Sequence, residues 1–117
     1  MSAKSIFEAF EACFQWLQPA MQDVDEDDLL NDLLTGHAQL WAGERGAVVT
    51  QCVQNPPTLH LWLAGGDLRD VMSLLPGGLA WARTMGLKQV TVDGRKGWSR
   101  VLKAYGFEGD DMLVRAI

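Results

Sequence analysis

Cysteine, histidine and tyrosine are scarce in this sequence, and long hydrophobic runs are missing. The 117 residues include two cysteines, two histidines and one tyrosine. Because Cys13 and Cys52 lie far apart and have no metal-type spacing, we expect neither a disulfide framework nor a metal site. No segment reaches the roughly 20 apolar residues that a membrane-spanning helix needs, and acidic residues interrupt the N-terminal segment where a secretory signal would be apolar. We therefore expect a cytoplasmic protein without membrane contacts.

Net positive charge is missing too. The formal net charge is −5 and the isoelectric point is near 4.8, so the surface as a whole repels nucleic-acid phosphates. Hydrophobic residues make up 48% of the sequence and charged residues 21%, which is the balance of a globular protein. A chain of this length has room for one hydrophobic core. We expect a single domain over residues 1–117 and no nucleic-acid partner.

The first third of the chain has the apolar spacing of two amphipathic helices. In the segment 5–18, apolar residues recur at helical intervals, with Ser5 as a candidate N-cap and Pro19 just beyond the end. The run VDEDDLLNDLLTG then places acidic residues in a first helical turn and stops at Gly36. We assign these carboxylates to capping and not to a cation. The helical part is predicted to span residues 5–35.

Residues 37–117 alternate between strand and helix patterns. Three β-type runs, HAQLWA, AVVTQCVQ and TLHLWLA, are separated by turn residues and predict three antiparallel strands. A helix broken at residues 76–78 and ending at Gly86 follows, and then a strand (LKQVTVDG), a helix (RKGWSRVLKAYG) and a final strand (MLVRAI). This order predicts an α/β (α+β) fold with a mixed, mostly antiparallel sheet flanked by helices.

Short motifs of a known superfamily occur in the last part of the chain. Ala82 stands four residues before Gly86 at the end of the long helix, and Gly106-Phe107 follows the last helix. Together with the order of elements, these features resemble the GNAT superfamily of acyl-CoA-dependent N-acyltransferases. The resemblance covers residues 37–117 as topology and residues 79–107 as sequence, and it implies a GNAT-like fold.

The same resemblance implies where an acyl-CoA donor would bind. In the family, a glycine-containing loop at the start of the central helix directs backbone N–H groups at the diphosphate. The corresponding stretch here is AGGDLRDVM, which makes Gly65, Gly66 and Arg69 the candidate cofactor-binding residues. The two glycines are adjacent rather than alternate, and Asp67 and Asp70 bring negative charge towards a polyanion. We expect the donor loop to be absent or heavily altered.

The general acid that the resemblance implies is replaced as well. The family places a tyrosine four residues before the glycine of the Gly-Phe pair, and that position here is Leu102. Tyr105 is the fallback acid, although it lies on a different side of the helix. His37 or His60 is a candidate base acting through water. No other catalytic residue is predicted.

A second, narrower resemblance concerns the start of the last helix. The run VDGRKGWSRVLKAYGF, through Gly94, Arg95, Gly97 and Trp98, is similar to small GNAT-like proteins encoded by tailed bacteriophages and prophages. It implies a viral context, in which some such proteins serve in the virion or its assembly. The candidate contacts for a protein partner or an anion are basic or aromatic: Arg95, Lys96, Trp98 and Arg100. The alternative is a solvated helix face whose charges are compensated by nearby acidic residues.

Two functional hypotheses follow. The main one is a non-catalytic GNAT-fold bacteriophage protein that needs no cofactor and acts through contacts with other proteins, such as phage structural proteins, in the host cytoplasm or the virion. The altered donor loop and Leu102 favour it. The alternative is an acyl-CoA-dependent N-acetyltransferase with a degenerate donor loop, which would use acetyl-CoA. Binding of acetyl-CoA separates the two, because a ligand of the folded state raises its stability.

Overall fold

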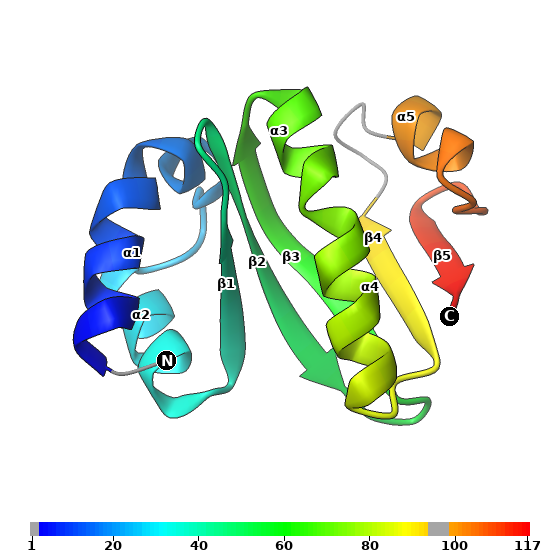
Figure 1. The fold of residues 1–117 in the computed structure, drawn as a ribbon, viewed down its shortest axis with the longest axis horizontal. Coiled ribbons are helices and arrows are strands. Elements are labelled where there is room, and N and C mark those ends of the chain that lie inside the picture. Colours follow the sequence, from blue (N-terminus) through cyan, green and yellow to red (C-terminus); the bar gives the residue numbers. More distant parts are fainter. Residues whose placement is uncertain (1–2, 94–98) are drawn as a thin grey trace.

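The computed structural model describes residues 3–93 and 99–117. In chain order, its elements are α1 (Ala3–Leu17), the short 3-10 helix η1 (Gln18–Ala20), α2 (Glu26–Thr35), β1 (Ala38–Ala42), β2 (Gly46–Val53), β3 (Thr58–Gly66), α3 (Leu68–Ser73), α4 (Leu75–Thr84), β4 (Gln89–Asp93), α5 (Ser99–Ala104) and β5 (Met112–Ala116). Figure 1 shows α1 and α2 together beside β1, and α3 and α4 running along the sheet.

The five strands form one sheet in the order β1-β2-β3-β4-β5. Neighbouring strands are antiparallel, except for β3 and β4, which run parallel. A parallel pair needs a crossover connection, and α3 and α4 supply it. The predicted mixed, mostly antiparallel sheet flanked by helices is confirmed.

The helices α1 and α2 cover one face of β1, β2 and β3. Buried side chains from these elements form a first core cluster, which includes Phe10, Leu17, Leu29, Leu33, Val49 and Leu63. The predicted cap of α1 is wrong, because the helix already includes Ala3 and Ser5 therefore lies inside it. No proline or glycine precedes Ser5 to stop the helix from extending towards the N-terminus.

The predicted start and end of α2 are both confirmed. Asp25 caps the helix, because its Oδ1 accepts hydrogen bonds from the backbone N–H of Asp27 at 2.8 Å and of Asp28 at 3.1 Å. Gly36 ends the helix in the left-handed conformation, with φ at 83°. The acidic first turn thus serves capping, as the sequence pattern indicates.

The predicted break between α3 and α4 lies two residues too late. The chain leaves α3 after Ser73, and Leu74 separates it from α4. Pro76 and Gly78 are inside α4, and Pro76 occupies its first turn. A proline costs nothing at that position, because the N–H it lacks has no intrahelical partner there. The interruption therefore lies at Leu74, and the expected place of Pro76 at the start of the second helix holds to within one residue.

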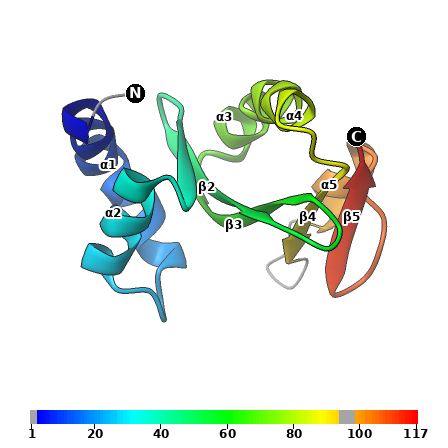
Figure 2. The same ribbon diagram turned by 90° about the horizontal axis from the view of Figure 1, so that it is seen from below.

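A second core cluster lies on the other face of the sheet, under α3, α4 and α5. Its members come from these helices, from β3, β4 and β5, and from the turns beside them: Leu59, Met72, Leu79, Ala82, Leu87, Val90, Leu102, Phe107 and Leu113. Figure 2 shows α3 and α4 on the opposite side of the sheet from α1 and α2. No helix in the described part of the chain has the length and apolar character needed to span a bilayer.

The predicted last helix is observed from Ser99 onwards as α5, and residues 94–98 lie outside the described residues. Gly106 follows it with φ at 90°, a conformation that favours glycine, as expected for the residue after a helix. Phe107 is buried in the second cluster and leads into a bridge between Glu108 and Val114 of β5. The closing helix and strand thus agree with the sequence pattern.

Candidate functional site

The strands β3 and β4 separate part-way along their length. Their ladder of residue pairs ends at Leu61 and Val92. β3 continues to Gly66, whereas β4 ends at Asp93. A strand inside a sheet turns alternate backbone groups towards its two neighbours. Among the described residues, the β4-side edge of β3 therefore has no strand partner beyond Leu61.

A β-bulge lies at the same point of β3. On the β2 side, Val49 pairs with Leu63 and Thr50 pairs with Leu61, so Trp62 is an extra residue in the register. A bulge bends its strand and changes the direction of the neighbouring groups. Trp62 packs against the first core cluster, whereas Leu61 packs against the second. The bulge therefore marks the point where β3 and β4 part.

A mostly apolar cavity of about 130 Å³ lies where these strands part. Its wall includes residues of the two strands and of the helices above them: Leu61, Ala64, Val92, Met72 and Leu102. Ala20 and Trp62, which pack with the first cluster, line it as well. Residues packed with both core clusters therefore contribute to the wall of this cavity.

A fixed tryptophan forms another part of the cavity wall. The indole Nε1 of Trp41 donates a hydrogen bond to Thr50 Oγ1 at 3.0 Å, and Thr50 Oγ1 in turn donates to Gln39 Oε1 at 2.8 Å. The ring of Trp41 also meets Trp81 of α4 edge-on, with 5.8 Å between the ring centres. Trp41 is therefore held by β2 on one side and by α4 on the other.

Of the two candidate bases, only His60 lies near the parting of the strands. It pairs with Thr91 across the β3–β4 ladder, and its Nδ1 is 2.9 Å from Thr91 Oγ1. Burial lowers the pKa of His60, and the nearby Asp93 carboxylate, which lines the cavity, partly offsets this effect. His37 is exposed before β1 with its Nδ1 2.8 Å from Thr35 Oγ1. Neither histidine is part of the cavity wall, although Leu59 and Leu61, the neighbours of His60 in β3, both line it.

Two aspartates occupy the turn from β3 into α3. The Oδ1 atom of Asp67 accepts hydrogen bonds from the backbone N–H of Arg69 at 2.8 Å and of Asp70 at 3.3 Å. The Oδ2 atom of Asp70 accepts one from the N–H of Arg45, in the β1–β2 turn, at 2.8 Å. The N–H of Asp67 donates to the carbonyl of Arg45 at 2.8 Å. The amides at the start of α3 are thus bonded to a carboxylate of the same chain.

The predicted cofactor-binding glycines have packing roles at this turn. A Cβ on Gly65 would collide with the carbonyl oxygen of Trp16 in α1. Gly66 has φ at 103°, and a Cβ there would collide with the backbone of Arg45 and Gly46. Close approach of α1 and of the β1–β2 turn therefore explains both glycines. Their assignment to cofactor binding stays a prediction.

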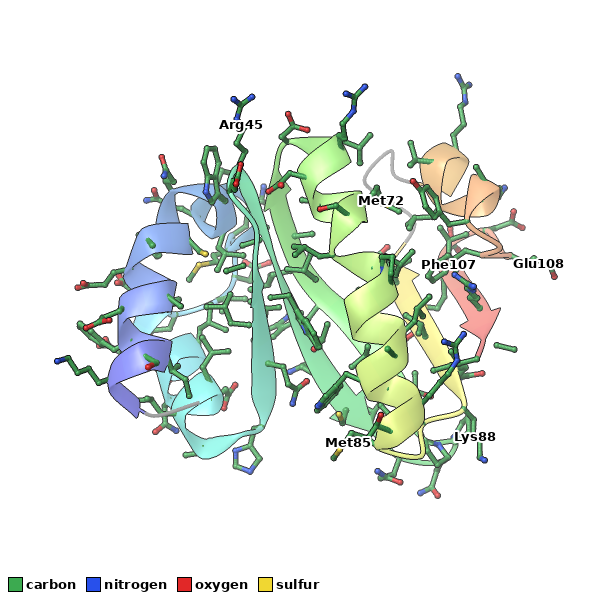
Figure 3. The ribbon with its side chains drawn as sticks, in the orientation of Figure 1. Arg45, Met72, Met85, Lys88, Phe107 and Glu108 are labelled. Carbon is green, nitrogen blue, oxygen red and sulfur yellow. The ribbon has the colours of Figure 1, made fainter. Side chains whose placement is uncertain are left out.

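The remaining predicted enzyme residues lie on two sides of α5. Leu102 is 2% exposed and lines the cavity. Arg69 and Tyr105 line a separate, more open groove between α3 and α5. Figure 3 shows Met72, which borders both spaces, between α3 and α5. Tyr105 is thus separated from the cavity, and its role as an acid stays a prediction.

The predicted basic and aromatic contact residues are described only in part. Arg100 lies on α5 and is exposed. Arg95, Lys96 and Trp98 lie outside the described residues. An interaction surface at this helix therefore stays a prediction.

The sequence analysis missed the cavity and the bulge that helps to form it. TLHLWLA alternates like a regular strand, and Trp62 has no glycine or proline beside it to indicate an irregularity. The bulge depends on pairing with β2, which is a long-range contact. Asp67 was identifiable as a cap, because it stands directly before a run with helical spacing.

Comparison with solved structures identifies the fold. Ard1 from Thermoplasma volcanium superposes with a TM-score of 0.69 at 16% identity over 100% of this chain and 94% of its own. An acetyltransferase from Bacillus subtilis in complex with CoA has a TM-score of 0.64 at 12% identity, with 92% of each chain covered. A GNAT family acetyltransferase from Brucella melitensis in complex with acetyl-CoA has a TM-score of 0.62 at 18% identity, over 98% of this chain and 81% of its own. No family model and no curated protein matches the sequence.

The chain therefore has the GNAT fold, and the main functional hypothesis needs correction. The expectation of a non-catalytic bacteriophage protein acting through protein contacts is contradicted, because the similar structures include acetyltransferases with CoA or acetyl-CoA bound. That hypothesis relied on the altered loop after Gly66 and on Leu102. Neither residue pattern closes the cavity between β3 and β4.

Proposed function

We propose that this protein is an N-acetyltransferase of the acyl-CoA-dependent type, which transfers a small acyl group from a thioester donor to an amine. The cavity at the parting of β3 and β4 carries this proposal. It is mostly apolar, it lies beside the edge of β3 that has no strand partner among the described residues, and residues of both core clusters contribute to its wall. A donor and an acceptor could thus approach one point from opposite faces.

The cavity fits the acyl end and the pantetheine arm of such a donor. Pantetheine is an extended chain with two amide groups, and the edge of β3 beyond Leu61 offers backbone groups in strand geometry. An extended ligand that adds to a sheet edge gains main-chain hydrogen bonds and side-chain pockets together. The apolar walls formed by Leu61, Val92 and Leu102 would exclude water from the thioester.

The carbonyl carbon of a thioester is activated, and the leaving group is a thiolate. Because thiols such as that of cysteine titrate at about 8.5, the thiolate can leave without first being protonated by a general acid. A site with Leu102 in place of a general acid is compatible with such a leaving group. The backbone N–H groups of β3 near Trp62 are candidates to stabilise the carbonyl oxygen, because a bulge redirects them. Trp41, fixed by Thr50 and Trp81, would limit the space for the acyl group.

Deprotonation of the amine is assigned to His60, acting through water. Its lowered pKa keeps the imidazole neutral at pH 7, the form in which it can accept a proton. A hydrogen bond from Nδ1–H to Thr91 Oγ1 would leave Nε2 as the acceptor atom. Asp93 lines the cavity and carries the charge that would attract a protonated amine towards it.

Binding of acetyl-CoA tests the proposal first. Thermal unfolding is measured with and without the ligand, and ligand at about 100 times its Kd should add about 2.7 kcal/mol to the stability of the folded state. With an unfolding entropy of about 2.1 cal/mol/K for each of the 117 residues, this corresponds to a rise of roughly 11 °C in Tm. Release of free thiol in the presence of a panel of amines then tests the transfer itself.

Obstruction of the cavity provides the matched comparison. Ala64→Leu places a larger side chain in the cavity wall, whereas Ala80→Leu makes the same change on the exposed face of α4. We expect the first variant to lose the ligand-induced rise in Tm and the thiol release, and the second to keep both. If the wild-type protein shows neither binding nor thiol release with any amine, the proposed function is wrong.

A further inference from the structure

The donor cavity is open along β3 but meets carboxylates where the strand ends. Its wall follows β3 as far as Ala64, and Gly65 and Gly66 lead directly into the turn formed by Asp67. A ligand that fills the cavity and extends past Ala64 therefore reaches the start of α3. The chemistry at this turn decides what the far end of the donor can be.

Four backbone N–H groups at this turn already have acceptors within the chain. Arg69 and Asp70 direct their N–H groups to Asp67 Oδ1, and the N–H of Asp67 is bonded to the carbonyl of Arg45. The N–H of Arg45 is bonded to the carboxylate of Asp70. An anionic group could use the amides of Arg45, Arg69 or Asp70 only by displacing a carboxylate of the same chain.

The fixed charges also disfavour an anion. The carboxylates of Asp67 and Asp70 are both held by backbone amides, so they cannot turn away without losing those bonds. Within the described part of the chain, two exposed arginines at the turn, Arg45 and Arg69, equal the two carboxylates in number and leave no positive excess. Figure 3 shows the side chain of Arg45 projecting outward from the tip of the β1–β2 turn.

We propose that the donor is selected through its acyl group and pantetheine arm, and that its diphosphate and nucleotide add little to binding. This inference rests on the proposed acyltransferase function and specifies the substrate class: S-acyl-pantetheine thioesters, with or without the nucleotide. The protein would then bind acetyl-CoA and S-acetylpantetheine with similar affinity. The carboxylate-filled turn at Asp67 and Asp70 is the reason.

Titration calorimetry of the whole chain with three ligands tests this inference. We expect S-acetylpantetheine and acetyl-CoA to have dissociation constants within about threefold of each other, and adenosine diphosphate to show no measurable heat of binding. Acetyl-CoA binding tighter than S-acetylpantetheine by about a hundredfold or more would overturn the inference and leave the acyltransferase function standing. Binding of adenosine diphosphate alone would overturn it as well. If neither thioester binds, the proposed function fails, and this inference fails with it.

A charge-removing variant shows whether the two carboxylates are the cause. Asp67→Asn and Asp70→Asn together keep oxygen acceptors for the same amides, since asparagine caps helices as well as aspartate does. We expect the double variant to bind acetyl-CoA about tenfold more tightly, because two repulsions from the diphosphate are removed, and to leave S-acetylpantetheine unchanged. Unchanged acetyl-CoA binding in this variant would contradict the assigned cause.

The second helix provides the matched control. Asp25 caps α2 with the same pair of hydrogen bonds, to Asp27 and Asp28, at a site away from the cavity. Asp25→Asn should change neither dissociation constant. An equal tightening of acetyl-CoA binding in this variant would indicate a general effect of net charge and would overturn the local explanation.

Discussion

Thr50 connects the stability of the fold to the shape of the proposed acyl site. It is 1% exposed, and its hydroxyl accepts a hydrogen bond from Trp41 Nε1 and donates one to Gln39 Oε1. Thr50→Val keeps the shape of the side chain and removes both hydrogen bonds. Trp41 and Gln39 are half-buried, so each unpaired group should cost about 1 kcal/mol, the low end of the usual range.

The expected loss of stability is therefore about 2 kcal/mol. With an unfolding entropy of about 0.25 kcal/mol/K for a chain of 117 residues, Tm should fall by roughly 8 °C. Differential scanning calorimetry measures this change directly. Because Trp41 lines the cavity, the same variant should also raise the KM for the acyl donor more than it lowers kcat.

The matched comparison is Thr50→Ser, which keeps the hydroxyl and removes only a methyl group. Its cost should be about 1 kcal/mol from the lost apolar burial, with both hydrogen bonds retained. Its KM should stay close to that of the wild-type protein. If Thr50→Val melts within about 2 °C of the wild type, the hydrogen-bonded chain contributes no net stability and the reasoning is refuted.

Three further changes test other parts of the structure. Burial lowers the pKa of His60, so below about pH 6.5 the unfolded chain binds more protons than the folded one, and stability decreases as the pH is lowered. His60→Gln should make the decrease in Tm between pH 8 and pH 5 smaller. An identical pH profile would contradict the assignment. Phe107 is 1% exposed, and Phe107→Ala should lower the free energy of unfolding by about 3–5 kcal/mol in denaturant unfolding. Met85 is 57% exposed, and Met85→Ala should change that free energy by less than about 0.5 kcal/mol. Similar costs for the two variants would mean that the second core is misidentified. Asp67→Ala should cost about 1 kcal/mol of stability and Asp67→Asn only a few tenths, measured by chemical denaturation, and equal costs would show that capping is not the role of this residue.

Local sequence patterns predicted most of the fold. The start of α2 could be predicted because Asp25 precedes an acidic turn and a leucine repeat, and its end because Gly36 follows. The first three strands, β1 to β3, could be predicted because β-branched and aromatic residues lie between turn residues. In each case the deciding interaction lies within a few residues of the chain. The start of α1 and the break before α4 were displaced, because neither carries a unique local signal.

The site was harder to predict because its parts meet only in the folded sheet. Trp62 becomes a bulge through pairing with β2, and the parting after Leu61 and Val92 depends on the relative lengths of β3 and β4. Motif comparison directed attention to Gly65 and Gly66, which the structure explains by packing against α1 and the β1–β2 turn. From the motif alone, Asp67 counts as an unfavourable charge in a donor-binding loop. In the structure, Asp67 caps α3, because its Oδ1 accepts a hydrogen bond from the backbone N–H of Arg69.

The two ends of the proposed donor site place different demands on the sequence. The acyl end lies where β3 and β4 stop pairing, so many different apolar residues can line it. Leu102 can therefore occupy the position where an acid is expected without closing the cavity. An anion site at the other end would require unpaired backbone amides, and the capping Asp67 already occupies two of them, those of Arg69 and Asp70. Altered motifs at the second end therefore carry little information about the first. Under this proposal the chain would keep an acyl cavity without an anion site, and the relative affinities for S-acetylpantetheine and acetyl-CoA test that separation.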